Sequence, residues 1–389
     1  MRLDASLSPD AARHTERARG FIVERIAAAG GWISFEHFME LALYAPGLGY
    51  YSAGARKFGG GGDFTTAPEI SGLFGGCIAQ QCAEILGALA GGSILEVGAG
   101  TGRLAVDALT RLESLGRLPE EYLILEVSAD LRERQRNLIC ERIPLLSSRV
   151  KWIDAPPADP FDGVILANEV LDALPVARFR WCESGCEELG VAVSHGLFHW
   201  SALPAGAGLT DTCGRLAAAA GGWEDGYVSE YCPRLAAWTH GIVQCLRRGA
   251  ALWFDYGLPR PHYYLPERQG GTLICHFRQR AHGDPFVHPG LQDISAWVDF
   301  TALAEACGAA RCDLAGFTTQ AHFLAGLGID REMNFLAGEN DGRFARLAGQ
   351  AKRLMLPGEM GESFKAMAWT RGISRELSGF ASRDLRHAL

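Results

Sequence analysis

The stretch SILEVGAGTG, residues 93–102, decides the fold of this chain. Its first half predicts a short buried strand, and its second half places Gly98, Gly100 and Gly102 just before a predicted helix. Glycine lets the backbone approach a ligand closely, and open α/β folds bind ligands at such strand-to-helix turns. The stretch therefore predicts a ligand-binding turn within a parallel sheet.

Alternating strands and helices surround this stretch, which is typical of a doubly wound parallel sheet. The strands that we predict lie at 93–97, 122–126, 150–153, 163–167 and 251–255, with later ones near 311–317 and 363–370. Helices fit between them at 104–115, 129–142 and 233–248. The sequence therefore predicts an α/β protein with a Rossmann-like, mostly parallel seven-stranded sheet.

The regions outside this pattern indicate how the chain is organised. Predicted helices at 16–29, 33–43 and 70–90, with a loop that carries four glycines at 59–62, form an N-terminal helical region over 1–90. Residues 91–389 would form the main domain. Three strands at 176–182, 187–193 and 197–203 predict a small β lobe, inserted at roughly 176–231.

Composition restricts the classes of protein and partner. The chain has 389 residues, of which 48% are hydrophobic and 21% are charged, so it can bury a large core. Its formal net charge of -8 argues against nucleic acid as a partner, because phosphates would repel such a surface. The 11 cysteines lack the spacing of a zinc site, so we expect no metal and free thiols.

The N-terminus carries Asp4 and Asp10 and has no apolar segment like that of a signal peptide. No apolar run reaches the roughly 20 residues that a membrane helix needs. We therefore expect no membrane span and a cytoplasmic protein.

The chemistry of the glycine stretch favours S-adenosylmethionine as the cofactor. Its spacing is G-x-G-x-G, whereas dinucleotide dehydrogenases carry G-x-G-x-x-G. A carboxylate at Glu96, just before the glycines, can hold the ammonium of S-adenosylmethionine. Glu126 ends the second predicted strand, where such folds place an acid on the ribose hydroxyls, and Asp154 follows the third strand, beside the expected adenine. Acidic residues exposed to solvent at the ends of strands would give the same pattern. Together, however, the glycine stretch and these acids predict a class I methyltransferase core.

Residues 167–175, ANEVLDALP, follow the fourth predicted strand, where this fold places the transferring methyl group. DNA and RNA amino-methyltransferases carry Asn-Pro-Pro-Tyr or Asp-Pro-Pro-Tyr there, and this chain does not. It has Asn168, Glu169 and Asp172 instead, and carboxylates bind the planar guanidinium of arginine through paired hydrogen bonds. The segment favours an arginine acceptor. The alternative also stays open that Asn168 caps a helix and Glu169 lies in its first turn.

Blocks of sequence spread over nearly the whole chain resemble the MidA family. The most distinctive are GDFTTAPEIS at 62–71 and NEVLDALP at 168–175. The others are the glycine turn and the short blocks at 49–51, 126–128, 255–257, 271–273, 292–294, 298–300, 319–320 and 360–365. The chain departs from the family pattern at His276, Gln279 and Trp297, which leaves the identity of the acceptor open.

The mitochondrial members of the MidA family are complex I assembly factors that dimethylate an arginine. The resemblance therefore implies S-adenosylmethionine as cofactor, dimethylated arginine as product and a respiratory complex I subunit as protein partner. It also implies that the loop at 62–71 closes over the cofactor, which adds Asp63 and Thr65 to the cofactor site. A homodimer is a possible assembly.

The expected catalytic residues are Asn168, Glu169 and Asp172, and the expected cofactor-binding residues are Asp63, Thr65, Glu96, Gly98, Gly100, Gly102, Glu126 and Asp154. Two other functions stay open. The chain could methylate a small molecule or a different protein side chain. It could also be an assembly chaperone that holds S-adenosylmethionine without turnover.

Overall fold

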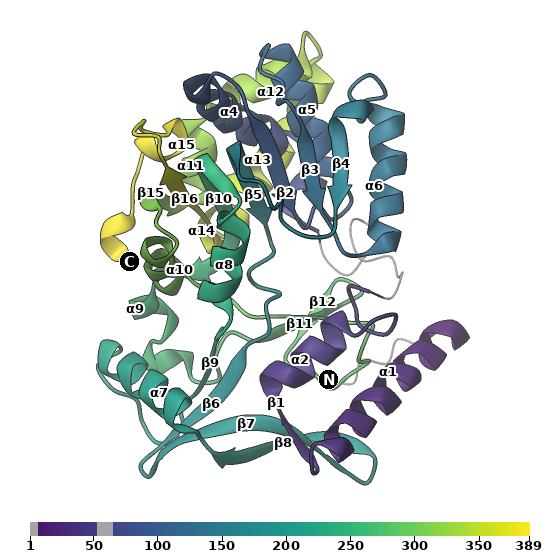
Figure 1. The fold of residues 1–389 in the computed structure, drawn as a ribbon, viewed down its shortest axis with the longest axis vertical. Coiled ribbons are helices and arrows are strands. Elements are labelled where there is room, and N and C mark those ends of the chain that lie inside the picture. The colour runs from purple at the N-terminus through teal and green to yellow at the C-terminus, as the bar shows by residue number, and fades with distance from the viewer. Residues whose placement is uncertain (1–6, 53–64) are drawn as a thin grey trace. The chain divides into compact units, whose positions relative to one another are not determined.

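The structure is a computed structural model that describes residues 7–52 and 65–389. The chain divides into two compact units that alternate along the sequence (Figure 1). The first, which we name the β unit, comprises Met1–Phe64, Ala173–Arg234 and Arg260–Trp297. The second, which we name the Rossmann-like unit, comprises Thr65–Asp172, Leu235–Pro259 and Val298–Leu389. The sequence-based domains, 1–90 and 91–389, stay a prediction.

The Rossmann-like unit is built on one large sheet whose strands follow the order β15-β16-β10-β5-β2-β3-β4, with β14 beside β10. The strands are β2 (Ser93–Val97), β3 (Tyr122–Leu125), β4 (Val150–Ile153), β5 (Phe161–Asn168), β10 (Leu246–Leu258), β14 (Val298–Asp299), β15 (Asp313–Thr319) and β16 (Phe364–Arg371). The neighbours from β10 through β4 pair in parallel, and only β16 runs antiparallel to both of its neighbours. The α/β class and the mostly parallel sheet are confirmed.

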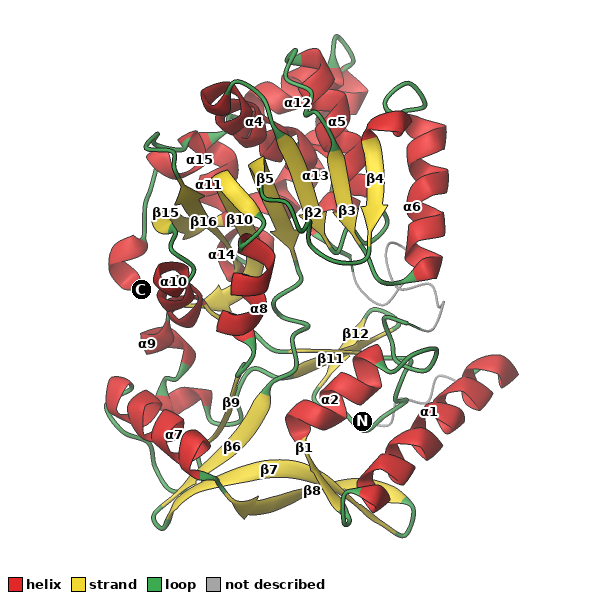
Figure 2. Ribbon diagram, in the orientation of Figure 1, coloured by secondary structure: helices red, strands yellow, loops and turns green. Residues whose placement is uncertain are grey.

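Helices pack around this sheet, as Figure 2 shows in red around the yellow strands. They are α3 (Ala67–Ile70), α4 (Gly72–Leu89), α5 (Arg103–Ser114), α6 (Ala129–Arg142), α8 (Leu235–Val243), α10 (Phe300–Ala309), α11 (Gln320–Gly326), α12 (Ile329–Ala337), α13 (Asp341–Met355), α14 (Met360–Ser363) and α15 (Ser378–Ala381). Short 3-10 turns lie at Ser147–Arg149 and Arg386–Ala388.

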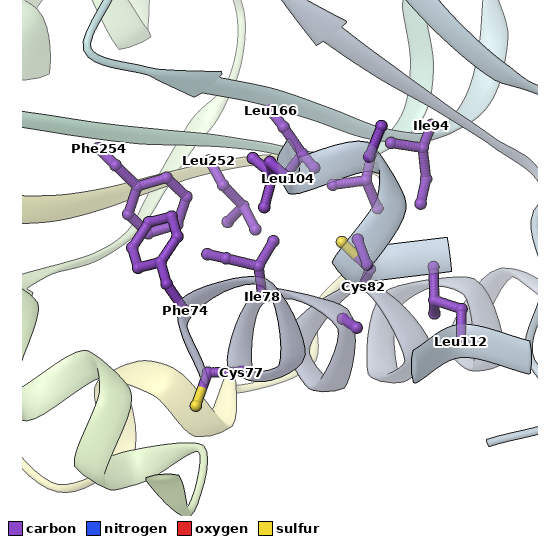
Figure 3. Packing of buried hydrophobic residues seen from close by; sticks show 14 of the residues in the cluster. Phe74, Cys77, Ile78, Cys82, Ile94, Leu104, Leu112, Leu166, Leu252 and Phe254 are labelled. Atoms are coloured by element: carbon purple, nitrogen blue, oxygen red, sulfur yellow. The ribbon is translucent and has the colours of Figure 1, made fainter. Parts of the chain in front are cut away.

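The alternation of β10 shows that both faces of the sheet are buried. Leu252 and Phe254 join the core that α4 packs against, where Phe254 meets Phe74 edge to face (Figure 3). The intervening Trp253 points to the other face, where its ring contacts Trp238 of α8 and Trp369 of β16. Successive side chains of a strand point to opposite faces, so the part of β10 that is covered on both sides, residues 250–254, is apolar.

The β unit carries two smaller sheets. The larger follows the order β1-β7-β6-β9, with β8 beside β7, and the smaller follows β12-β11-β13. Its elements are α1 (Pro9–Ala28), β1 (Trp32–Ser34), α2 (Phe35–Tyr44), β6 (Ala177–Cys182), β7 (Gly185–Ser194), β8 (Leu197–Pro204), α7 (Ala207–Ala219), β9 (Val228–Tyr231), α9 (Arg260–Tyr263), a 3-10 turn at Pro266–Arg268, β11 (Ile274–Phe277), β12 (Arg280–His282) and β13 (Asp293–Ser295). Isoleucine and aromatic side chains of α1 and α2 form the core of this unit with Val191 of β7.

Three local predictions differ from the structure. The helix expected at 33–43 starts at Phe35, because Trp32–Ser34 pairs as β1 with β7. The helix expected at 233–248 ends at Val243, since the long strand β10 begins at Leu246. The inserted lobe also contains α7, whose alanine- and glycine-rich sequence gave little periodic signal.

Candidate active site

The predicted ligand-binding turn joins β2 to α5 in the Rossmann-like unit. Gly98, Gly100 and Gly102 have φ angles of 65°, 54° and 85°, in the left-handed region that side chains other than glycine rarely adopt. A Cβ atom added to Gly98 would also lie 3.2 Å from Cγ2 of Val170, in the acceptor segment. The glycines are therefore required by the backbone, and they bring the turn against the segment that follows β5.

Glu96 lies at the end of β2 with only 3% of its surface exposed. Its Oε2 accepts a hydrogen bond of 2.7 Å from the hydroxyl of Tyr122 on the neighbouring strand β3. Burial raises the pKa of Glu96 to about 7, although the Tyr122 hydrogen bond opposes the shift. The Tyr122 hydrogen bond uses one acceptor site of the carboxylate and leaves Oε1 for a contact with the ammonium of a cofactor.

Glu126 and Asp154 lie at the ends of adjacent parallel strands, β3 and β4. The Glu126 carboxylate is buried and accepts hydrogen bonds from the backbone N–H of Ser128 and from Nε2 of Gln135. The Asp154 carboxylate is exposed and pairs with Arg132 of α6, whose guanidinium also donates to the backbone oxygen of Glu126. The structure thus brings the two predicted cofactor acids to one edge of the sheet.

Asn168 is the last residue of β5, and Glu169 and Asp172 lie in the turn segment after it, not in a helix. Glu169 has a φ of 53°, which is uncommon outside glycine, and its N–H donates to the backbone oxygen of Phe254 at 2.8 Å. Its Oε1 accepts from Nδ2 of Asn168 at 3.1 Å and from the N–H of Ala67 at 3.3 Å. The alternative that Asn168 caps a helix is wrong, because residues 169–174 form no helix. Glu169 instead accepts a hydrogen bond from the N–H of Ala67, the first residue of α3.

Asp255 of β10 is a buried acid that we did not include among the expected site residues. Its Oδ2 accepts the backbone N–H groups of Leu171 at 2.9 Å and Asp172 at 3.2 Å, and its Oδ1 accepts that of Tyr256. Burial raises the pKa of Asp255 well above its usual range, and the charges of Asp172 and Glu169 raise it further. Its position directly after the apolar run at 250–254 is the sequence signal that points to it.

The short helix α3 connects the glycine turn with the acceptor segment. The hydroxyl of Thr101 donates to the carboxylate of Glu69, while Glu169 accepts from the N–H of Ala67. Thr65, a predicted cofactor residue, is half-buried and lies two residues before this helix. Asp63 lies outside the described residues. Sequence reasoning missed Glu69, whose block at 62–71 was otherwise singled out.

Other candidates lie in the β unit. Glu230 of β9 is fully buried and accepts hydrogen bonds from Thr272 and Tyr263. His276 is partly buried in β11, which lowers its pKa. Across residues 7–52 and 65–389, no group of histidine, cysteine and acidic side chains is arranged to hold a metal ion. No helix in those ranges is long and apolar enough to cross a membrane.

The residues at this edge of the Rossmann-like unit fit S-adenosylmethionine. Carboxylates suit its ammonium and ribose hydroxyls, and the left-handed glycines leave the backbone accessible to a ligand. In addition, the buried Oδ1 of Asn168 has no hydrogen-bond partner among the described residues. A buried acceptor without a partner is costly, so it is suited to a ligand that donates a hydrogen bond.

Comparisons with known structures agree with this geometry. A crystal structure of a Burkholderia thailandensis protein bound to S-adenosyl-homocysteine has a TM-score of 0.94 and 42% identity, and the match covers 99% of both chains. A second crystal structure from the same organism has a TM-score of 0.91 and the same 42% identity, again over 99% of both chains.

Curated relatives of similar length are named as protein arginine methyltransferases of the mitochondrion. The Bos taurus protein is 30% identical, over 87% of this chain and 80% of the relative. The Danio rerio protein is 29% identical, over 87% of this chain and 83% of the relative. The Caenorhabditis elegans protein is 26% identical, over 93% of this chain and 87% of the relative. The cytoplasmic location expected from the sequence is wrong by this comparison, because these relatives are named as mitochondrial.

The family model that matches covers residues 77–318 and is described as "Putative S-adenosyl-L-methionine-dependent methyltransferase". Those residues include the glycine turn, Glu126, the acceptor segment and Asp255. The resemblance seen in the sequence is confirmed: the chain belongs to this family of S-adenosylmethionine-dependent methyltransferases.

Proposed function

We propose that this enzyme methylates an arginine side chain of a protein, a subunit of respiratory complex I. The observation that carries the proposal is the group of three acids formed by Glu169 and Asp172, in the segment after β5, and Asp255 of β10. The names of the curated relatives support arginine as the acceptor. A complex I subunit as the partner follows from the resemblance to the MidA family.

The cofactor in this proposal is S-adenosylmethionine, which supplies an electrophilic methyl group on a sulfonium. Glu96 would hold its ammonium, Glu126 its ribose hydroxyls and Asp154 its adenine edge. The turn at 98–102 would pass beside it, with Asp63 and Thr65 on the covering loop. The similar Burkholderia thailandensis protein holds S-adenosyl-homocysteine, the product that such a transfer leaves behind.

The carboxylates suit a guanidinium acceptor on electrostatic grounds. Asp172 and Glu169 both raise the pKa of Asp255, so the three acids lie close enough to repel one another when charged. A guanidinium remains charged at any physiological pH and binds carboxylates through a planar fork. Holding one of its nitrogens in line with the methyl group would lower the entropic part of the barrier. Asn168, with its buried Oδ1, would accept an N–H of the same group.

The variants Glu169→Gln and Asp172→Asn test the acceptor role. The Glu169→Gln side chain keeps an oxygen that can accept the Ala67 N–H, so the contact with α3 survives while the charge is lost. Charge-assisted hydrogen bonds are roughly twice as strong as neutral ones. We therefore expect methyl transfer to fall at least about tenfold in each variant, with affinity for S-adenosylmethionine within about twofold.

A matched control is Glu113→Gln, which removes an exposed charge from α5 of the same unit. Its transfer rate and melting temperature should equal those of the unaltered enzyme. Near-normal transfer in both Glu169→Gln and Asp172→Asn would contradict the acceptor role. A homodimer stays a prediction, which light scattering would test.

A further inference from the structure

Gln135 is a fully buried polar side chain in the middle of α6. The buried residues of this helix are Leu131, Gln135 and Ile139, four positions apart, so they form one stripe along the face that packs inward. An apolar residue would be expected at the centre of such a stripe, because burying an amide costs free energy unless it is fully hydrogen-bonded.

The amide of Gln135 is held by three residues from different elements. Its Oε1 accepts a hydrogen bond of 2.8 Å from Nε1 of Trp152 in β4. Its Nε2 donates to the backbone oxygen of Gly100 at 2.9 Å and to Oε2 of Glu126 at 3.2 Å. Gln135 also packs against the turn, since a Cβ added to Gly102 would lie 3.3 Å from its Cγ.

The Trp152 contact fixes which way the amide points. An indole N–H can only donate, so the group that faces it has to be the amide oxygen. The NH2 group is then directed to the opposite side, where both of its hydrogens have an acceptor. If the amide were reversed, its NH2 group would face the indole N–H of Trp152, which is also a donor. Its oxygen would then face two other acceptors, the backbone oxygen of Gly100 and the carboxylate of Glu126.

We propose that Gln135 is a positioning residue for the cofactor, which fixes the glycine turn and the ribose-binding carboxylate relative to each other. The proposal rests on the cofactor site given under Proposed function. One side chain bonds the middle glycine of the turn and the acid at the end of β3, and Trp152 locks its orientation from β4. In this proposal Gln135 acts through Gly100 and Glu126.

The variant Gln135→Met tests this role, because methionine fills a similar volume without hydrogen-bonding groups of comparable strength. We expect the KM and Kd for S-adenosylmethionine to rise about tenfold, with kcat within about twofold. Trp152→Phe leaves Gln135 in place and removes only the lock on its orientation. Trp152→Phe should also raise the Kd for S-adenosylmethionine, but by less than Gln135→Met does.

A matched control is Gln81→Met. Gln81 is also fully buried in the Rossmann-like unit, where its amide accepts the N–H of Gly379 and donates to the carboxylate of Glu84. Neither of these partners is a predicted cofactor residue. It should lose stability while the Kd for S-adenosylmethionine stays within about twofold. A merely structural role for Gln135 would make the two glutamine variants behave alike.

A double-mutant cycle with Glu126→Gln completes the test. If Gln135 acts by holding Glu126, the effect of Gln135→Met on the Kd should shrink at least about threefold in the Glu126→Gln background. Unchanged affinity in Gln135→Met, or fully additive effects in the cycle, would overturn the proposal. If the unaltered enzyme failed to bind S-adenosylmethionine at all, the cofactor site itself would be refuted, which is a different result.

Discussion

Glu96→Gln is the substitution whose effect the structure defines most sharply. The carboxyl is buried at the end of β2, and burial raises its pKa from 4.5 to about 7. In the unfolded chain the carboxyl ionises near its ordinary pKa, whereas in the folded protein it keeps its proton up to about pH 7. Its contribution to stability is therefore fully present below pH 4.5 and is lost as the pH rises to about 7.

The size of this effect follows from the same shift. At about 1.36 kcal/mol for each pH unit, a rise from 4.5 to about 7 corresponds to roughly 3 kcal/mol. Glutamine is neutral throughout and can still accept the Tyr122 hydroxyl at its oxygen. Between about pH 4 and pH 8 the unaltered protein should lose roughly 3 kcal/mol more stability than the variant.

Native-state hydrogen exchange of the β2 and β3 amides is the appropriate assay, because a chain with two compact units need not unfold in one step. Titrating groups that do not interact with Glu96 contribute equally to both proteins, so the difference between the two pH profiles reports on Glu96 and on the groups coupled to it, such as Glu126. Parallel profiles over this pH range would refute the reasoning. The same ionisation should appear in binding: affinity for S-adenosylmethionine should rise as the pH passes through about 7 in the unaltered protein and stay flat in Glu96→Gln.

Further predictions concern the turn, the ribose acid and the sheet. Gly100→Val should weaken S-adenosylmethionine binding strongly in calorimetry, because φ is 54° there and a branched side chain would be strained; normal affinity would show that the turn does not approach the cofactor. Glu126→Ala should weaken binding by roughly ten- to a hundredfold, through lost hydrogen bonds worth about 1.5–3 kcal/mol. An unchanged Kd for S-adenosylmethionine would show that Glu126 does not bind the ribose. Gly163→Ala should destabilise the protein by at least about 2 kcal/mol in thermal unfolding, because its Cβ would lie 1.8 Å from the Ser93 oxygen on β2. A small change in melting temperature would contradict the close approach of β2 and β5.

The parallel sheet could be predicted from the sequence because its strands are short apolar runs bounded by turn residues. β2 and β4 lie where we expected them, and α6 has the predicted bounds. Burial on both faces turns such strands into continuous apolar runs, which can be recognised in the sequence together with the turn residues that bound them.

The contacts of the site could not be predicted in the same way. Glu169 caps α3 through Ala67, which lies 102 residues earlier in the chain. Gln135 could not be singled out in a helix of mostly polar residues, since only the fold shows that it faces Gly100 and Glu126. Such contacts depend on which strand ends meet, and no local propensity encodes them.

The most direct test of the central claim is transfer of a radiolabelled methyl group from S-adenosylmethionine by the purified enzyme in a mitochondrial extract. The account predicts label in a complex I subunit, recovered as methylated arginine after hydrolysis and reduced with Glu126→Ala when S-adenosylmethionine is limiting. Label confined to small molecules or to another side chain would contradict the arginine assignment. Tight binding of S-adenosylmethionine with no transfer to any acceptor would contradict an enzymatic function and favour an assembly chaperone.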